Sequence, residues 1–411
     1  MEQLRESCEK AASYPLNLVH PNAYRHTLNY YHSRLDSREK DLFRDQESSS
    51  VDILDLNFPE ATFDNTTIKD VSTLKKHLWR DLEVDNLSIE EEKLPIRCRF
   101  VFMTAPNSHE KLDISREMMA YVFSYMQISP RFLDFVMSFG RTECVRSFPC
   151  SGFWQKNTID DEVQALAIPE LGRSGNEIMF CYILRGVESS KADPGLPWSI
   201  RPMAVHHTFD GETSNSQWVV VNASQIMKSS IESIMKSQKT PLVTDFKTVE
   251  ETIHSYLTFH QLVSEWSAEG WQWYIDYLDD QLQSLTRHAL AVPVEKPSAT
   301  DVLTGEFSFS DLQKAQALGE KVHEAIFVLK SNDAVLSELK ASFIIFIDEY
   351  SSKLQHSISV SQKNLRTQIS RAECLFCLAS DRKKLLYSIL QYKNGKQSVP
   401  SPKRPRARLT P

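Results

Sequence analysis

The stretch that decides the fold is "NEIMFCYILRGVE", residues 176–188, which is dense in apolar and β-branched side chains. Two stretches of the same kind follow it, "MAVHHTFD" (203–210) and "SQWVVVNAS" (216–224). The loops between them are rich in glycine, proline and serine, as in "SSKADPGLPW" (189–198). Short apolar runs bounded by turn residues are typical of β-strands. We therefore expect three or four strands, close in sequence, between residues 140 and 224.

The preceding residues predict one more strand and a helix. "IRCRFVFMTA" (96–105) is short, rich in β-branched and aromatic residues and followed by a proline, as expected for a buried strand. "DISREMMAYVFSYMQI" (113–128) has helical spacing, and Asp113 or Ser115 is placed to cap its first turn. Strands with helices before and after them predict a mixed α/β head over residues 91–225.

The first 90 residues are polar and rich in turn-forming residues. Short helices are expected around Tyr24–Leu35 and Val71–Leu82, and we interpret residues 1–90 as a polar N-terminal segment with short helices.

From residue 226 onward the sequence is helical, with one segment over 226–300 and a longer one over 301–392. The longer segment carries a seam at alternating spacings of four and three, typical of a coiled coil. Its members are Leu318, Val322, Ala325, Leu329, Asn332, Leu336, Leu339, Phe343, Phe346 and Tyr350. After a phase slip, a second register comprises Ile358, Leu365, Ile369, Ala372, Phe376, Leu386 and Leu390. One long helix and two antiparallel helices with a break near Ser351–Ser352 are both compatible with this pattern. The predicted fold class is α+β, a head followed by long, mainly antiparallel C-terminal helices that form a stalk.

Composition excludes several classes of protein. The chain has 411 residues, 41% hydrophobic and 25% charged, as in ordinary globular proteins. Its net charge of −7 argues against a nucleic-acid binder. Its seven cysteines show no regular spacing, which indicates reduced thiols inside a cell. The most apolar run, "FIIFI" (343–347), is far shorter than the ~20 residues of a membrane span, and "MEQLRESCEK" is no secretory signal. We expect a cytoplasmic location for the chain as written.

Carboxylates in "WQWYIDYLDDQL" (271–282) are the candidate metal ligands. Asp276 and Asp280 lie one helical turn apart, with Asp279 adjacent, and such a pair can share a hard divalent cation that keeps several waters. The alternative is a solvated helix face. Trp271 falls on the apolar stripe and is predicted to be core, whereas Trp273 is expected to pack against a neighbouring helix.

The remaining candidates give no catalytic or cofactor-binding residue. Cys374 and Cys377 have the spacing of a zinc pair, but they fall within the heptad register, which predicts small core residues. His206 and His207 lie in a predicted strand, so their rings should point to opposite faces. Either one would need Cys181 or Cys150 beside it to form a catalytic dyad. The sequence has no phosphate-binding glycine loop and no metalloprotease or hydrolase motif, and we expect a protein that is not an enzyme.

Several long stretches resemble the fungal proteins that carry a CorA-like transporter domain. They are "YPLNLVHPNAYRHTL", "CRFVFMTAPNSHEKLDISREMMAYVFSYMQISPRFLDFVMSFG", "IPELGRSGNEIMFCYILRGVE", "WSIRPMAVHHTFDGET", "EGWQWYIDYLDDQLQSLTRHAL", "FSFSDLQKAQALGEKVHEAIFVLKSNDAVLSELK" and "DRKKLLYSILQYKN". The resemblance covers roughly residues 13–393. It implies the layout of CorA magnesium transporters: an α/β cytosolic head, then long helices, the last of which continues into the first of two membrane spans.

This sequence has no Gly-Met-Asn signature and no span where that family has them. The last helix is expected to end at Tyr392, and residues 393–411 to form a disordered, basic, proline-rich tail. One hypothesis is that the tail from Gly395 onward is intron read-through or a shifted frame, with the spans encoded downstream. The other is a genuine soluble paralogue that lost its pore.

The resemblance implies a non-enzymatic cytosolic domain of a CorA-like Mg²⁺ transporter-like protein that lacks the pore. It has no cofactor, apart from a possible regulatory Mg²⁺ held by carboxylates between neighbouring heads. The alternative is a stand-alone helical scaffold that pairs through its seam, at Leu329 and Leu336, with itself or with full-length relatives.

Overall fold

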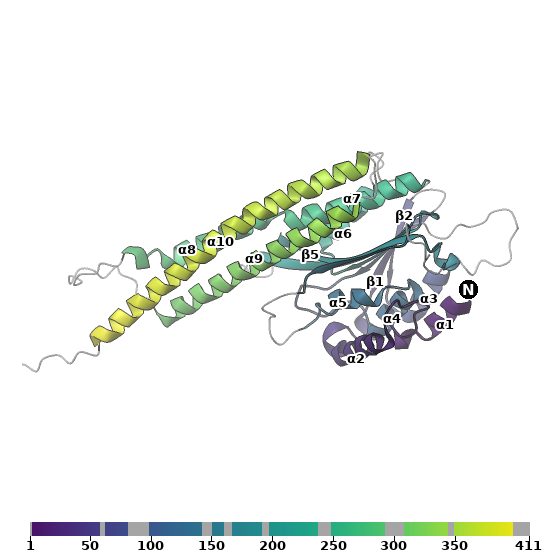
Figure 1. Cartoon of the computed structure of the whole chain (residues 1–411). Helices are drawn as coiled ribbons and strands as arrows, with labels where there is room; N and C mark the ends of the chain where they lie inside the picture. Colours follow the sequence, from purple (N-terminus) through teal and green to yellow (C-terminus); the bar gives the residue numbers. More distant parts are fainter. Residues whose placement is uncertain are drawn as a thin grey trace, which may run out of the picture. The chain divides into compact units, whose positions relative to one another are not determined.

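The computed structural model describes residues 2–57, 62–80, 98–141, 150–159, 167–190, 197–236, 248–291, 308–343 and 349–397 (Figure 1). Its α-helices are α1 (Glu2–Glu9), α2 (Arg25–Leu42), α3 (Val71–Trp79), α4 (Arg116–Tyr125), α5 (Leu133–Val136), α6 (Gln225–Lys236), α7 (Val249–Ala268), α8 (Trp271–Thr286), α9 (Phe309–Ser342) and α10 (Glu349–Gln397). Its strands are β1 (Val51–Asn57), β2 (Thr62–Ile68), β3 (Cys98–Met103), β4 (Gly152–Asn157), β5 (Glu177–Ser189), β6 (Trp198–Asp210) and β7 (Ser216–Val221).

The described strands form one seven-stranded sheet in the order β2-β1-β3-β7-β6-β5-β4. β3 and β7 are parallel, and the other neighbouring pairs are antiparallel. The predicted strands correspond to β3, β5, β6 and β7, and the predicted α+β class is confirmed. β1 and β2 were missed, and they place part of the N-terminal segment in the same sheet as the head.

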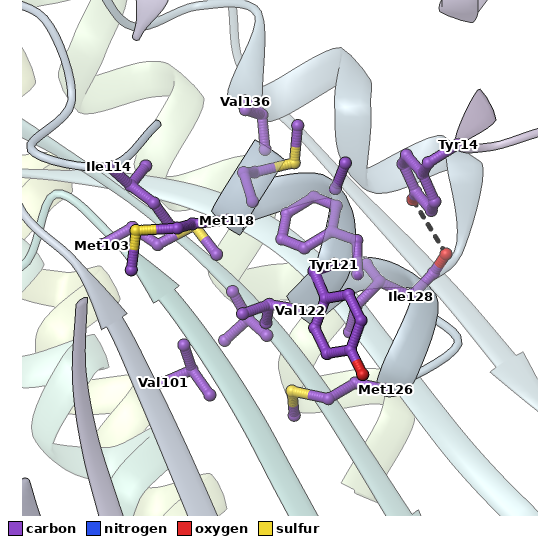
Figure 2. Packing of buried hydrophobic residues seen from close by; sticks show 14 of the residues in the cluster. Tyr14, Val101, Met103, Ile114, Met118, Tyr121, Val122, Met126, Ile128 and Val136 are labelled. Carbon is purple, nitrogen blue, oxygen red and sulfur yellow. Dashed lines mark hydrogen bonds between the residues drawn. The ribbon is translucent and has the colours of Figure 1, made fainter. Parts of the chain in front are cut away.

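One face of this sheet is covered by α1–α5 (Figure 1). Figure 2 shows the packing there, where Val101 and Met103 of β3 meet Met118 and Val122 of α4. Ser115 caps α4, since its hydroxyl accepts a hydrogen bond from the backbone N–H of Met118 at 3.2 Å. This is one of the two caps that the sequence predicted.

The other face is lined by aromatic residues and covered by α7 and by the C-terminal part of α9. Phe100 of β3 stacks on Trp218 of β7 with ring centroids 5.2 Å apart, and Phe259 of α7 packs edge-on against Phe100 at 4.9 Å. Phe343, directly after α9, contacts Phe180 of β5 at 5.5 Å. The middle of the sheet is therefore buried on both faces, which explains why β3, β5 and β7 are almost continuously apolar.

The long C-terminal segment is two helices rather than one. α9 ends at Ser342 and α10 begins at Glu349, slightly before the break expected at Ser351–Ser352. They are antiparallel, because Ser351 Oγ donates to the carbonyl of Phe343 at 2.8 Å and Gln362 Nε2 donates to Ser337 Oγ at 2.7 Å. α10 extends beyond Tyr392 to Gln397, and residues 398–411 of the predicted tail lie outside the described residues.

The chain divides into two compact units. One comprises residues 1–270 and 330–365, and the other residues 271–329 and 366–411. One boundary falls at Gly270, between α7 and α8, and the other two fall inside α9 and α10. Among the described residues, no helix combines the length and the apolar character that a membrane span requires.

The predicted seam is confirmed from Val322 to Phe343, whereas Leu318 is half-buried, and Phe346 and the side chain of Tyr350 lie outside what the structure describes. The second register is wrong in one place. Val322, Ala325, Leu329, Asn332, Leu336, Leu339 and Phe343 are all buried. In α10, however, Leu375 is buried and Phe376 is 39% exposed. The buried residues of α10 are Ala372, Leu375 and Ala379, which are spaced by three and then by four. The predicted register had a spacing of four after Ala372, which placed Phe376 in the core instead of Leu375.

Gly186 of β5 lies directly beneath an aromatic ring of α7. A Cβ atom at this position would lie 2.5 Å from the Trp266 ring. The indole cannot simply move, because its Nε1 donates to Glu188 Oε1 at 2.9 Å. We expect Gly186→Ala to lower the free energy of unfolding by about 2–3 kcal/mol, at the upper end of overpacking costs. Urea unfolding measures this loss, and adding Trp266→Phe should restore part of it. Additive losses in the double variant would contradict the predicted contact.

Candidate functional site

The two carboxylates predicted to bind a metal lie on α8 in the second unit, in different environments. Asp276 is half-exposed and forms an ion pair with Arg371 of α10 through Oδ1 and Nη2. Asp280 is exposed, one turn further along the helix. Asp279 accepts a hydrogen bond from Gln283 Nε2 at 3.1 Å. A cation at Asp276 would have to displace the Arg371 guanidinium, or bind the carboxylate oxygen that Arg371 leaves open.

No group of three or more histidine, cysteine or acidic side chains in the described part of the chain is arranged to hold a metal ion. A cation at Asp276 and Asp280 would therefore keep most of its waters, or would take further oxygen ligands from another molecule. The nearby tryptophans differ in burial. Trp271 is fully buried, as predicted, whereas Trp273 is 61% exposed, and its packing against a neighbouring helix stays a prediction.

Cys374 and Cys377 are not core residues. Both are exposed on α10, although the heptad register predicted small buried side chains. The reason is the register itself: the seam passes through Ala372, Leu375 and Ala379, which leaves both thiols on the outer face. They share that face one turn apart, but no third ligand for a metal lies beside them among the described residues.

The paired histidines of β6 point to opposite faces of the sheet, as the strand alternation predicts. His206 lies in the cluster under α1–α5, edge-on to Phe132 at 5.4 Å, and it is the cross-strand neighbour of Cys181. Neither ring nitrogen of His206 has a hydrogen-bond partner among the described residues. Burial, with Arg173 nearby, lowers the pKa of His206 to about 3.

Cys181 and His206 do not form an activated nucleophile and base. Burial raises the pKa of the Cys181 thiol well above its ordinary value, while it lowers that of the imidazole. Both groups are therefore neutral, and they are at most 1% exposed. A catalytic cysteine needs thiolate character and access to substrate, and this pair has neither.

His207 belongs to a buried hydrogen-bonded chain on the opposite face. Its Nδ1 lies 3.1 Å from His260 Nε2, and its Nε2 lies 3.0 Å from Ser216 Oγ. The chain continues from His260 Nδ1 to the Tyr182 hydroxyl at 2.9 Å. If Tyr182 donates to His260, His260 to His207 and His207 to Ser216, every ring nitrogen is satisfied with both imidazoles neutral. Burial lowers the pKa of both histidines, to about 3 for His260.

Sequence reasoning missed His260 because its partner, His207, comes from a distant strand, and the local sequence of α7 does not indicate which residues lie opposite it. The only signal was that it neighbours Phe259, on the buried side of α7. The chain from Tyr182 to Ser216 is buried, and each donor in it has an acceptor, so we interpret it as a structural link between α7 and the sheet.

A buried ion cluster joins α3 to β1 and β3. Asp55 accepts two hydrogen bonds from Arg99, at 2.6 and 3.0 Å, and lies 3.0 Å from His77 Nε2. Burial alone would raise the pKa of Asp55, but the Arg99 and His77 contacts outweigh it and hold the pKa well below its usual range. This cluster explains why the polar strand β1 is stable inside the head.

Comparison with known proteins identifies a family for this arrangement. A family model described as CorA-like transporters matches residues 6–290, which cover all seven strands and reach past α8. A search of curated proteins gives no match.

The chain also aligns with solved structures. The complete CorA magnesium transporter from Methanocaldococcus jannaschii aligns over 84% of this chain and 79% of its own, with 9% identity and a TM-score of 0.44. The soluble domain of CorA from the same organism aligns over 74% and 92%, with 11% identity and a TM-score of 0.41. The cytoplasmic domain of ZntB from Vibrio parahaemolyticus aligns over 85% and 99%, with 9% identity and a TM-score of 0.41.

Proposed function

The chain belongs to the CorA-like transporters, and we propose that it acts as the cytoplasmic, non-enzymatic head and helical extension of a divalent-cation transporter. The observation that carries this proposal is the family match over residues 6–290, which spans the whole sheet with the helices on both its faces. The sealed, neutral state of Cys181 and the buried histidines favours a structural head over an enzyme.

We take Mg²⁺ as the regulatory cation and α8 as its place of binding. Asp276 and Asp280 supply hard oxygen ligands one turn apart, and Arg371 neutralises Asp276 when the cation is absent. Mg²⁺ would then exchange with the guanidinium. A ligand that binds only the folded state stabilises it by about 1.4 kcal/mol at ten times its Kd.

The test compares the chain with and without millimolar Mg²⁺. We expect Mg²⁺ to raise the thermal unfolding midpoint and to change the mass measured by light scattering. The double variant Asp276→Asn, Asp280→Asn should lose both responses. Asp381→Asn is the matched control, because Asp381 is an exposed carboxylate of α10 and its partner among the described residues, Lys384, belongs to the same helix.

Two results would count against this proposal. No response of the unmodified chain to Mg²⁺ would contradict cation regulation. A response that the double variant keeps would move the cation away from α8.

The alternative of a scaffold that pairs through its seam is not favoured. Leu329 and Leu336 are both fully buried within a single chain, so they are not available to a partner. Placing Asp at both positions would unfold the helices rather than test association. Self-association stays part of the proposal, but it must use other surfaces.

A further inference from the structure

The second compact unit contains an apolar groove between the first half of α9 and the second half of α10. Its inner part has a volume of about 220 Å³ and is floored by Ala315, Gly319 and Ala379. Its outer part has a volume of about 520 Å³ and is walled by Phe309, Leu312 and Tyr387. The two parts are continuous, because Gln316, Glu320 and Lys383 line both.

The groove exists because small residues face each other across the helix pair. A Cβ atom built at Gly319 would meet no atom within 4 Å, although the residue lies in the middle of α9. A helix interior normally disfavours glycine relative to alanine, by about 1 kcal/mol. Gly319 therefore lowers the stability of α9 relative to alanine, and the space beside it is filled by no described side chain.

The walls of the groove expose aromatic rings to water. Phe309 is 66% exposed and Tyr387 is 52% exposed. Among the described residues, six of the eleven large apolar side chains that are exposed lie in this smaller unit: Trp273, Leu290, Phe309, Phe376, Tyr387 and Tyr392. A concentration of exposed apolar surface indicates a surface that something covers.

The charged groups at the groove are mainly cationic. Within the described residues, Lys383 Nζ donates to the Gln316 amide oxygen at 2.8 Å, and Glu320 accepts from Gln316 Nε2 at 2.7 Å. Lys384 is 73% exposed, with a surface contact of 3.2 Å to Asp381. The Lys383 ammonium group thus lines the apolar groove, and the Gln316 amide that accepts its hydrogen bond is uncharged. A ligand with an apolar chain and a negative head matches both features.

We propose that this groove binds a long-chain fatty-acid carboxylate. The alkyl chain lies on Ala315, Gly319 and Leu312 between Phe309 and Tyr387, and the carboxylate pairs with Lys383 and Lys384. The site is independent of the proposed cation regulation, because Asp276 and Asp280 line neither part of the groove.

The test uses a fluorescent polyene fatty acid as the probe and palmitate as its competitor, with the full chain. Gly319→Leu places a side chain in the open space, and we expect it to weaken probe binding by about tenfold or more. Ala334→Leu is the matched control, because Ala334 is exposed on the same helix outside the groove. It should leave the affinity unchanged. Lys383→Gln with Lys384→Gln should weaken carboxylate binding but not the binding of the fatty alcohol of equal length.

Urea unfolding of Gly319→Leu and of the double lysine variant checks that both still fold, and Gly319→Ala tests the open space without filling it. Gly319→Ala should raise the free energy of unfolding, since it improves helix propensity without a steric contact.

Several outcomes would overturn the proposal. They are probe binding that Gly319→Leu does not change, equal affinity for carboxylate and alcohol, or no binding at all. A chain that dimerises, that becomes monomeric on Gly319→Leu and that ignores palmitate would identify a second copy as the occupant instead.

Discussion

Lowering the pH from 7 to 5 should lower the free energy of unfolding of the first compact unit by about 6 kcal/mol. It buries three histidines, His206, His207 and His260, each at most 1% exposed. Burial lowers the pKa of all three, to about 3 for His206 and His260. The folded chain therefore keeps them neutral at a pH where an unfolded chain, with histidine pKa values near 6.5, takes up protons.

The sign follows from proton uptake. Stability falls with decreasing pH wherever the unfolded state binds more protons than the folded state. For these histidines the window opens below about pH 6.5 and extends down toward the folded values. Each contributes about 1.4 kcal/mol per pH unit there, so three together contribute about 4 kcal/mol per unit. Between pH 6.5 and pH 5 the three histidines therefore remove about 6 kcal/mol, which equals the whole stability of a domain at the lower end of the usual range of about 5–15 kcal/mol.

Two substitutions separate protonation from packing. His206→Phe keeps the edge-on ring contact with Phe132 and sacrifices no hydrogen bond, because the His206 nitrogens have no partner in the described structure. It should leave stability at pH 7 nearly unchanged and reduce the slope of unfolding free energy against pH by about one third. His207→Phe breaks the contacts with His260 and Ser216 and should destabilise the chain already at pH 7.

Urea unfolding at a series of pH values between 7 and 4.5 measures both slopes. If His206→Phe has the slope of the unmodified chain, His206 is protonated in the folded state or is not buried as described. A flat profile for the unmodified chain would refute the prediction for all three histidines.

The sequence predicted the strands that are in apolar surroundings on both faces, and it missed β1, where apolar and charged surroundings are mixed. β5 is covered on both faces, so its residues from Ile178 to Leu184 are all apolar, and this composition is readable without knowledge of the fold. β1, "VDILDLN", carries two aspartates. Asp55 is stable there only because Arg99, His77 and Arg80 surround it, and these residues come from two other places in the chain, β3 and the end of α3. No local pattern contains that information.

The candidate site shows the same limit. One helical position separates Phe376, which was predicted as core, from Leu375, which is buried. That one-residue shift also moves Cys374 and Cys377 from the predicted core to the outer face. The spacing of apolar residues in a sequence shows that a segment is a helix with one buried face. Which of two adjacent residues points into the core depends on the helix that packs against it. The Arg371 partner of Asp276 was likewise invisible, because 95 residues separate the two in sequence.

Asn332 shows how a polar residue in an apolar seam fixes the position of a helix. It is 1% exposed, and its side-chain amide binds the backbone of β5 at two points. Its Oδ1 accepts from the N–H of Arg185 at 3.1 Å, and its Nδ2 donates to the carbonyl of Arg185 at 2.7 Å. β4 pairs with β5 only as far as Ile183, so the amide takes the place of the missing strand at Arg185. Nδ2 also donates to the carbonyl of Ser267 at the end of α7, at 3.0 Å.

Asn332→Leu should therefore be among the most damaging single changes in the chain, although it makes the seam uniformly apolar. It removes three hydrogen bonds in a buried site, and each buried group that loses its partner costs about 1–3 kcal/mol. We expect the free energy of unfolding to fall by about 3–6 kcal/mol in total, and the amide of Arg185 to exchange its hydrogen faster than its neighbours do.

Asn364→Leu in α10 is the matched control. Asn364 donates to the carbonyl of Ala268 at 3.0 Å, but its side chain is exposed, so water can replace the lost contact. Its cost should stay below about 1 kcal/mol. If the two variants unfold at the same urea concentration, the buried amide contributes no more than a surface one. In that case the apolar seam alone would hold α9 against the sheet, as an uninterrupted heptad would.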